Sequence, residues 1–136
     1  MLGSALLLVA LIGCRQSSST DASLSPGSTD GGAAFVEGTV SAGPTCPVER
    51  NPPDPSCADR PVAGAVLLVL DPAGAEVART VSAADGTFVV RLRPGVYRLV
   101  PQPREGLMGT AQPVDFQVQD GISLPPLRVT YDTGIR

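Results

Sequence analysis

The stretch Thr87–Leu99 reads TFVVRLRPGVYRL and holds two short runs of alternating residues on either side of a proline and a glycine. A period of two places every second side chain on the same face of a β-strand. Between the runs, Arg93-Pro94-Gly95 predicts a type II turn with a positive φ at Gly95, because proline fixes its own φ and glycine accepts positive values. The stretch therefore predicts two neighbouring strands, Thr87–Leu92 and Val96–Val100, joined by a tight turn.

A similar pattern of short strand-like runs continues on both sides of this stretch. From residue 35 onward, short apolar or alternating runs are divided by Gly, Pro and Asp, and none has a helical period. This pattern is typical of an all-β sandwich or barrel. Five further strands bring the expected number to seven: Phe35–Val40, Ala65–Leu70, Glu76–Ser82, Val114–Gln119 and Ile122–Val129.

Two of these strands have predictable places in a sheet. Ala65–Leu70 is apolar on both faces, which favours the centre of a sheet. Ile122–Val129 contains Pro125-Pro126, and proline has no N–H to donate, so this strand should lie at an edge or carry a break. The side chains expected to point into the core are Phe88, Val90, Leu92, Tyr97, Leu99, Val114, Phe116 and Val118.

A basic surface follows from the predicted turn. If Leu92 pairs with Tyr97 across it, then Arg91 lies beside Arg98 on the outward face, with Arg93 at the tip. Like charges directly opposite each other are unfavourable, so the arrangement predicts a carboxylate partner or an anionic ligand at these three arginines. The alternative, which we prefer, is a solvated basic face that protects a sheet edge.

The three cysteines divide into a pair and a single residue. Cys46 and Cys57 flank a proline-rich loop with no regular pattern, and a disulfide would order it, contributing about 3 kcal/mol in an oxidising compartment. A zinc site is the rival interpretation, but two cysteines without further soft ligands make a poor one. The acidic residues of the loop, which are expected to be solvated carboxylates or at most a weak calcium site, are Glu49, Asp54 and Asp59.

The remaining cysteine ends an apolar run from Ala5 to Ile12 that is too short to span a bilayer. The tetrapeptide Leu11-Ile12-Gly13-Cys14 resembles the end of a bacterial lipoprotein signal. The resemblance implies cleavage before Cys14 and a diacylglyceryl thioether on its sulfur, which would attach the protein to a membrane. The alternative is a buried strand or short helix of a cytosolic protein.

These segments predict four parts. They are a signal peptide (1–13), a lipidated cysteine with a disordered Ser/Gly-rich tether (14–34), one β-sandwich domain (35–131) and a tail (132–136). The tether has almost no bulky apolar residue, so burial cannot offset its ordering entropy.

Composition excludes most chemistry. All ten basic residues are arginine, the net charge is −3, and the chain contains no histidine, lysine or tryptophan. Without histidine or lysine, the common nucleophile pairs, imidazole metal sites, Schiff bases and P-loops cannot be assembled. Only a carboxylate pair would remain for catalysis. We therefore expect a protein that is not an enzyme, with no metal, no cofactor and no nucleic-acid partner.

Three blocks resemble the carboxypeptidase regulatory-like domains, a prealbumin-like (transthyretin-like) family of β-sandwiches. They are Val36–Val40 (VEGTV), Pro61–Leu68 (PVAGAVLL), and Asp85–Phe88 (DGTF) followed by Leu92–Leu99 (LRPGVYRL). The resemblance implies a seven-stranded, Ig-like Greek-key sandwich. It implies no activity, because the family's namesake is an accessory module beside a zinc peptidase and contains none of the peptidase's catalytic residues.

Taken together, these features predict a lipid-anchored, extracytoplasmic and non-enzymatic module with a binding or structural role at the cell envelope. Its partner would be an unknown envelope protein or glycan. The alternative is a carbohydrate- or peptide-binding accessory protein of an envelope enzyme or transporter. Sugar sites need exposed aromatic faces, and with three aromatic residues assigned to the core only Phe35 and Tyr131 remain for such a site.

Overall fold

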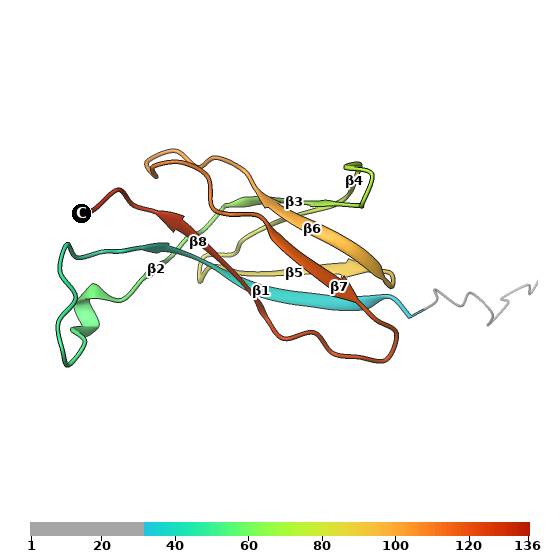
Figure 1. Cartoon of the computed structure of the whole chain (residues 1–136), viewed down its shortest axis with the longest axis horizontal. Coiled ribbons are helices and arrows are strands. Elements are labelled where there is room, and N and C mark those ends of the chain that lie inside the picture. Colours follow the sequence, from blue (N-terminus) through green and yellow to red (C-terminus); the bar gives the residue numbers. More distant parts are fainter. Residues whose placement is uncertain (1–31) are drawn as a thin grey trace, which may run out of the picture.

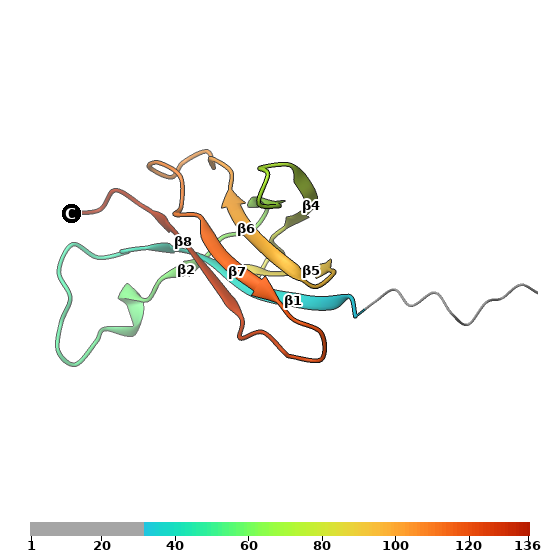
Figure 2. The ribbon, with the colours of Figure 1, turned by 45° about the vertical axis from the view of Figure 1, so that its right-hand side comes forward.

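A computed structural model describes residues 32–136 of the chain, so the predicted signal peptide, Cys14 and nearly all of the predicted tether lie outside the described residues. The described part is all-β, with two sheets packed face to face and one short 3-10 turn (Figures 1 and 2). No helix within residues 32–136 is long and apolar enough to cross a membrane.

Eight strands form the two sheets, which we call sheet A and sheet B. Sheet A contains β1 (Ala34–Gly43), β2 (Arg60–Pro61), β5 (Thr87–Leu92) and β8 (Leu127–Asp132). Sheet B has the order β4 (Glu76–Val81), β3 (Val66–Leu70), β6 (Gly95–Pro101) and β7 (Val114–Val118).

Strand β1 organises sheet A along its whole length. Its first half pairs antiparallel with β5, its second half pairs antiparallel with the two residues of β2, and β8 runs parallel to Gly38–Gly43. Because β8 overlaps both other partners in register, β5 and β2 must share the opposite edge of β1. The long strand also carries the chain from the end where residue 32 lies to the end that holds the C-terminus (Figure 1).

The strand prediction needs two corrections. We predicted seven strands, and the structure has eight, because Arg60–Pro61 forms a short ladder with β1 that is too brief to leave a pattern in the sequence. The last strand was predicted over Ile122–Val129, but β8 starts at Leu127 and ends at Asp132. It begins directly after Pro125-Pro126, where both residues lack the N–H that a ladder needs. It does lie at a sheet edge, as predicted.

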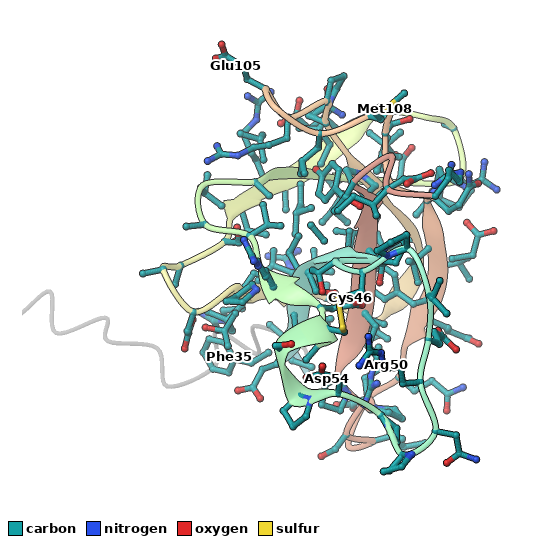
Figure 3. All side chains as sticks on the ribbon, turned by 90° about the vertical axis from the view of Figure 1, so that its left-hand side faces the viewer. Phe35, Cys46, Arg50, Asp54, Glu105 and Met108 are labelled. Carbon is teal, nitrogen blue, oxygen red and sulfur yellow. A yellow bond between two sulfur atoms is a disulfide. The ribbon has the colours of Figure 1, made fainter. Side chains whose placement is uncertain are left out.

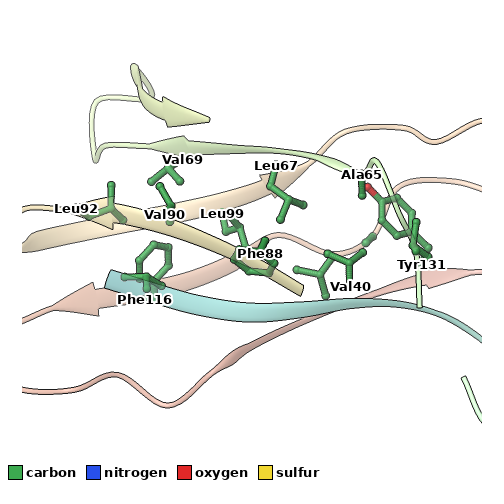
Figure 4. Packing of buried hydrophobic residues seen from close by; sticks show 14 of the residues in the cluster. Val40, Ala65, Leu67, Val69, Phe88, Val90, Leu92, Leu99, Phe116 and Tyr131 are labelled. Atoms are coloured by element: carbon green, nitrogen blue, oxygen red, sulfur yellow. The ribbon is translucent and has the colours of Figure 1, made fainter. Parts of the chain in front are cut away.

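The core fills the space between the sheets (Figure 4). In β5 the side chains alternate between exposed and buried, and Val36, Val40, Leu67, Val69, Leu99, Val129 and Tyr131 have almost no exposed surface. Central β3 lies between β4 and β6, as its apolar sequence predicted. The one buried polar side chain of the described part, Ser82, donates its hydroxyl to the carbonyl of Val62 and accepts from the N–H of Ala65.

The connection after β5 is a corner between the sheets and not a hairpin. Strand β5 pairs with β1 in sheet A, whereas β6 pairs with β3 and β7 in sheet B. The predicted pairing of Leu92 with Tyr97 is therefore wrong. Instead, the Tyr97 hydroxyl donates to the carbonyl of Arg93 at 2.8 Å. A tyrosine that bonds back to the backbone just upstream, where the chain changes sheets, is the geometry of a tyrosine corner.

The predicted type II turn is also wrong, because Gly95 is not among the described glycines with a positive φ. A close contact explains the glycine better. A Cβ on Gly95 would lie 3.2 Å from the hydroxyl oxygen of Tyr97 and 3.3–3.4 Å from carbons of its ring. The absence of a side chain at Gly95 therefore lets the ring fold back over the start of β6, where its hydroxyl reaches Arg93.

Candidate interaction surfaces

The three arginines predicted to form one basic surface do not share a hairpin. Arg91 lies on the outer face of sheet A, where it is opposite Phe35 of β1. Arg93 follows β5 in the corner, and Arg98 lies on β6 of sheet B. The like-charge pair that motivated the prediction is therefore absent, since Arg91 and Arg98 belong to different sheets. An anion or partner role for these residues stays a prediction.

Arg98 has a carboxylate partner across the β6–β7 pair. Its Nε donates to Asp115 Oδ1 at 2.6 Å, and its Nη2 donates to Oδ2 at 3.1 Å. This two-point hydrogen bond holds the pKa of Asp115 below its usual value. Because both side chains are more than half exposed, the pair is screened by water and adds little stability.

The other carboxylates with perturbed pKa values accept hydrogen bonds from nearby side chains and backbone N–H groups. Hydrogen bonds from Ser56, Arg79 and Thr87 lower the pKa of Asp54, Glu76 and Asp85, respectively. A bidentate contact with Arg136 and the N–H of Gly134 lower the pKa of Asp132 to about 2. These groups stabilise the fold above the ordinary carboxyl pKa and lose that effect as the pH falls through their lowered values. All of them are ionised near neutral pH, the opposite of what a general acid requires.

A groove crosses the outer face of sheet A. Two adjoining hollows of about 560 and 510 Å³ share Glu37, and we call them together the Glu37 groove. The loop after β7 lines the first hollow, and β4 with β5 lines much of the second. Four large apolar side chains of its lining are about half exposed or more: Phe35, Val81, Val89 and Ile122.

Of the two aromatic residues left for a ligand, only Phe35 is on the surface. Its side chain is 69% exposed in the Glu37 groove. Tyr131 has no exposed surface, and its hydroxyl donates to the carbonyl of Gln102 at 2.6 Å. Tyr131 is therefore not available to a ligand, because it lies on the same buried face of β8 as Val129.

The disulfide loop lies at the end of the sandwich opposite residue 32 (Figures 1 and 3). Cys46 and Cys57 are bonded, with their Cα atoms 5.2 Å apart, which confirms the predicted pairing. Asp54 accepts from the N–H of Ser56 and caps the 3-10 turn η1 (Pro55–Cys57). Glu49, Asp54 and Asp59 do not come together, since no group of three His, Cys, Asp or Glu within residues 32–136 could hold a metal ion.

Comparison with known proteins supports the fold alone. No protein-family model matches the chain, and no curated protein matches it in sequence. Among solved structures, the Bacillus anthracis TIE protein is similar, with a TM-score of 0.52 and 14% sequence identity. The similarity covers 73% of this chain but only 17% of that protein. The likeness fits a β-sandwich.

Proposed function

We propose that this protein is a lipid-anchored, extracytoplasmic module whose sandwich has a non-enzymatic binding or structural role at the cell envelope. The observation that carries the proposal is the bond between Cys46 and Cys57. Disulfides form and persist mainly in oxidising compartments outside the cytosol. The bond accounts for two of the three cysteines, and the third, Cys14, ends the signal-like tetrapeptide.

The direction of the chain supports display away from a membrane. A lipid on Cys14 would hold the sandwich from the end where residue 32 enters β1. The disulfide loop and the C-terminus lie at the other end (Figure 1). The sequence blocks that resemble carboxypeptidase regulatory-like domains fit such a module, and we assign the sandwich to the prealbumin-like type on that basis.

Replacement of Cys14 is expected to abolish membrane attachment. In bacteria that express the full chain and are fed an alkyne-tagged fatty acid, the unaltered protein should be labelled and recovered with membranes. Cys14→Ser should lose the label completely, because its side chain has no thiol to carry the lipid. The matched control is the double variant Cys46→Ser/Cys57→Ser, which should keep the label. Recovery of the unaltered protein in the cytosol, unlabelled and with residues 1–13 attached, would refute the proposal.

One observation favours the second candidate function, a carbohydrate-binding accessory protein. In the Glu37 groove, the exposed ring of Phe35 lies in the same hollow as the carboxylates of Glu37 and Asp120. An aromatic face can stack on a sugar ring, and carboxylates accept hydrogen bonds from its hydroxyl groups. We therefore name a glycan as the occupant that this hollow would take.

A panel of mono- and oligosaccharides tests this candidate through the melting temperature. If it is right, one glycan should raise the melting temperature saturably, and Phe35→Ala should abolish the rise. Val48→Ala is a matched control, because Val48 is similarly exposed, at 68% against 69%, but lies in the disulfide loop at the other end. If no glycan in the panel gives a saturable shift, the carbohydrate-binding function is refuted, and the proposal of a lipid-anchored module is unaffected.

A further inference from the structure

Five strands lie at sheet edges: β4 and β7 in sheet B, and β8, β5 and β2 in sheet A. The two residues of β2 are too few to act as a template, and the edges of β4, β5 and β8 are protected. An unpaired edge presents free N–H and C=O groups to other chains, so proteins usually cover or distort it. Strand β4 has a register irregularity opposite Val69 and Leu70, which distorts its edge. On β5, the outward carbonyls of Thr87 and Val89 accept from the N–H of Ala83 and the Thr80 hydroxyl.

Strand β8 is protected at both ends. Pro125-Pro126 comes directly before it, and at its other end the N–H of Met108 donates to the carbonyl of Asp132 at 3.0 Å. Proline at the start of a strand and a covering loop at its end are both recognised ways to limit pairing with other chains.

Strand β7 also follows a proline, Pro113, but within the described residues it has neither a bulge nor a covering loop. It pairs with β6 over five consecutive residues without a bulge, and no other strand within residues 32–136 pairs with its outer edge. None of the backbone hydrogen bonds between loops in that range reaches Val114–Val118. Its one charged residue, Asp115, is already neutralised by Arg98, so it protects the edge less than an unpaired charge would. The strand is a regular, uncovered template.

We propose that β7 pairs antiparallel with β7 of a second copy, so that the two B sheets continue as one eight-stranded sheet. The two-fold axis would pass between the two Phe116 residues. In this register, all five residues of the strand find a partner: Phe116 faces Phe116, Val114 faces Val118, and Asp115 faces Gln117. A two-fold axis makes each of these contacts twice where the residues differ.

The polar row of this register is self-complementary. Asp115 and Gln117 point away from the core, on the outer face of sheet B. The Gln117 amide is a hydrogen-bond donor, and the Asp115 carboxylate has acceptor positions beyond the two that Arg98 uses. A register centred on Asp115 would instead place two aspartates opposite each other and bring Pro113 into the ladder. Both changes are unfavourable.

Cysteine crosslinking tests the register in lysates of cells that express the full chain. In the proposed dimer, the two Gln117 residues are diagonal neighbours about 7–8 Å apart, with their Cβ atoms somewhat closer. A short bismaleimide should therefore convert Gln117→Cys to a dimer. Gln112→Cys is the control, because Gln112 is exposed but would lie about 27 Å from its copy. The chain without added cysteines measures how much dimer the reagent forms through Cys14 alone. No dimer from Gln117→Cys, an equal dimer from Gln112→Cys, or a ladder of larger products would overturn the proposal.

Charge changes at the same position test the pairing without a crosslinker. Gln117→Glu would place two carboxylates opposite each other twice in the dimer, and we expect the dimer dissociation constant from sedimentation velocity to rise about tenfold. Gln117→Lys would face Asp115 with an opposite charge and should dimerise at least as well as the unaltered chain. Gln112→Glu, the same change away from the edge, should leave the constant unchanged. Equal effects of the two glutamate variants would refute pairing through β7.

Discussion

Replacing Gly38 with alanine is expected to lower the free energy of unfolding by about 3 kcal/mol. Gly38 lies on the inward face of β1, opposite Phe88 of β5 on one side and Leu127 of β8 on the other. A Cβ there would lie 2.4 Å from a ring carbon of Phe88 and 2.5 Å from the carbonyl oxygen of Leu127. The ring is 5% exposed and cannot swing into solvent, and the oxygen belongs to a paired strand. The sheet itself must therefore shift.

Urea denaturation of the purified protein measures this loss, with Gly74→Ala as the control. Gly74 has a φ of +83° and no neighbouring atom within 4 Å of its would-be Cβ. Alanine at position 74 would make no close contact, but it would have to adopt a positive φ, which lowers the free energy of unfolding by about 1 kcal/mol. If Gly38→Ala proves no more destabilising than Gly74→Ala, the ring of Phe88 does not pack closely against β1 at Gly38.

A double-mutant cycle separates the two contacts of the new methyl group. Phe88→Leu alone should destabilise the protein, because it leaves a cavity in the core. In the Gly38→Ala background the same change should cost less, since it relieves the clash with the ring. The rescue should be partial, because the contact with the Leu127 carbonyl remains. Full additivity would mean that the ring does not press on Gly38.

The parts of the fold that were predictable from the sequence are those set by local alternation. Every second residue of Thr87–Leu92 is buried, and so are Phe116 and Val118. A strand buried on one face must carry apolar residues with a period of two, so its sequence records the face directly. The central place of β3 follows in the same way from its apolar residues on both faces.

The sheet to which each strand belongs was not predictable in the same way. Two alternating runs around Pro94-Gly95 suit a hairpin and a corner equally well, and the choice depends on partners far away in the sequence. Because β5 and β6 do not form a hairpin, the predicted basic surface does not form either. Its prediction required Arg91 and Arg98 to be neighbours on paired strands. A local signal was present in Tyr97, since a tyrosine just after a Pro-Gly step can bond back to the backbone before it.

The candidate site was less predictable than the fold. The Glu37 groove brings β1 and β5 together with the loop between β7 and β8, segments whose proximity no local pattern reveals. Tyr131 was left for a ligand site, since it lies beyond Val129, where the last strand was expected to stop. The alternation of Leu127, Val129 and Tyr131 was the signal that could have placed the tyrosine in the core.

Removal of the Cys46–Cys57 bond is expected to lower the free energy of unfolding by about 3 kcal/mol. The cysteines are 11 positions apart, and closing a loop of this length removes conformational entropy from the unfolded chain. Cys46→Ser/Cys57→Ser measured by urea denaturation should show this loss. The m-value, which is the slope of the free energy of unfolding against urea concentration, should also rise, because the unfolded chain without the crosslink exposes more surface. A reductant should reproduce both changes in the unaltered protein and change nothing in the double variant.

The size of the loss depends on whether the loop stays ordered without its crosslink. Both of its ends are held independently: Ser41 and Ala42 pair with β2, and the Thr133 hydroxyl donates to the carbonyl of Pro44. Asp54 caps the 3-10 turn inside it. If these contacts keep the folded loop in place, removing the bond raises the conformational entropy of the unfolded chain alone. The free energy of unfolding should then fall by the full amount, about 3 kcal/mol. Protease cleavage within residues 47–53 of the double variant, with a loss below about 1 kcal/mol, would instead show that the bond itself orders the loop.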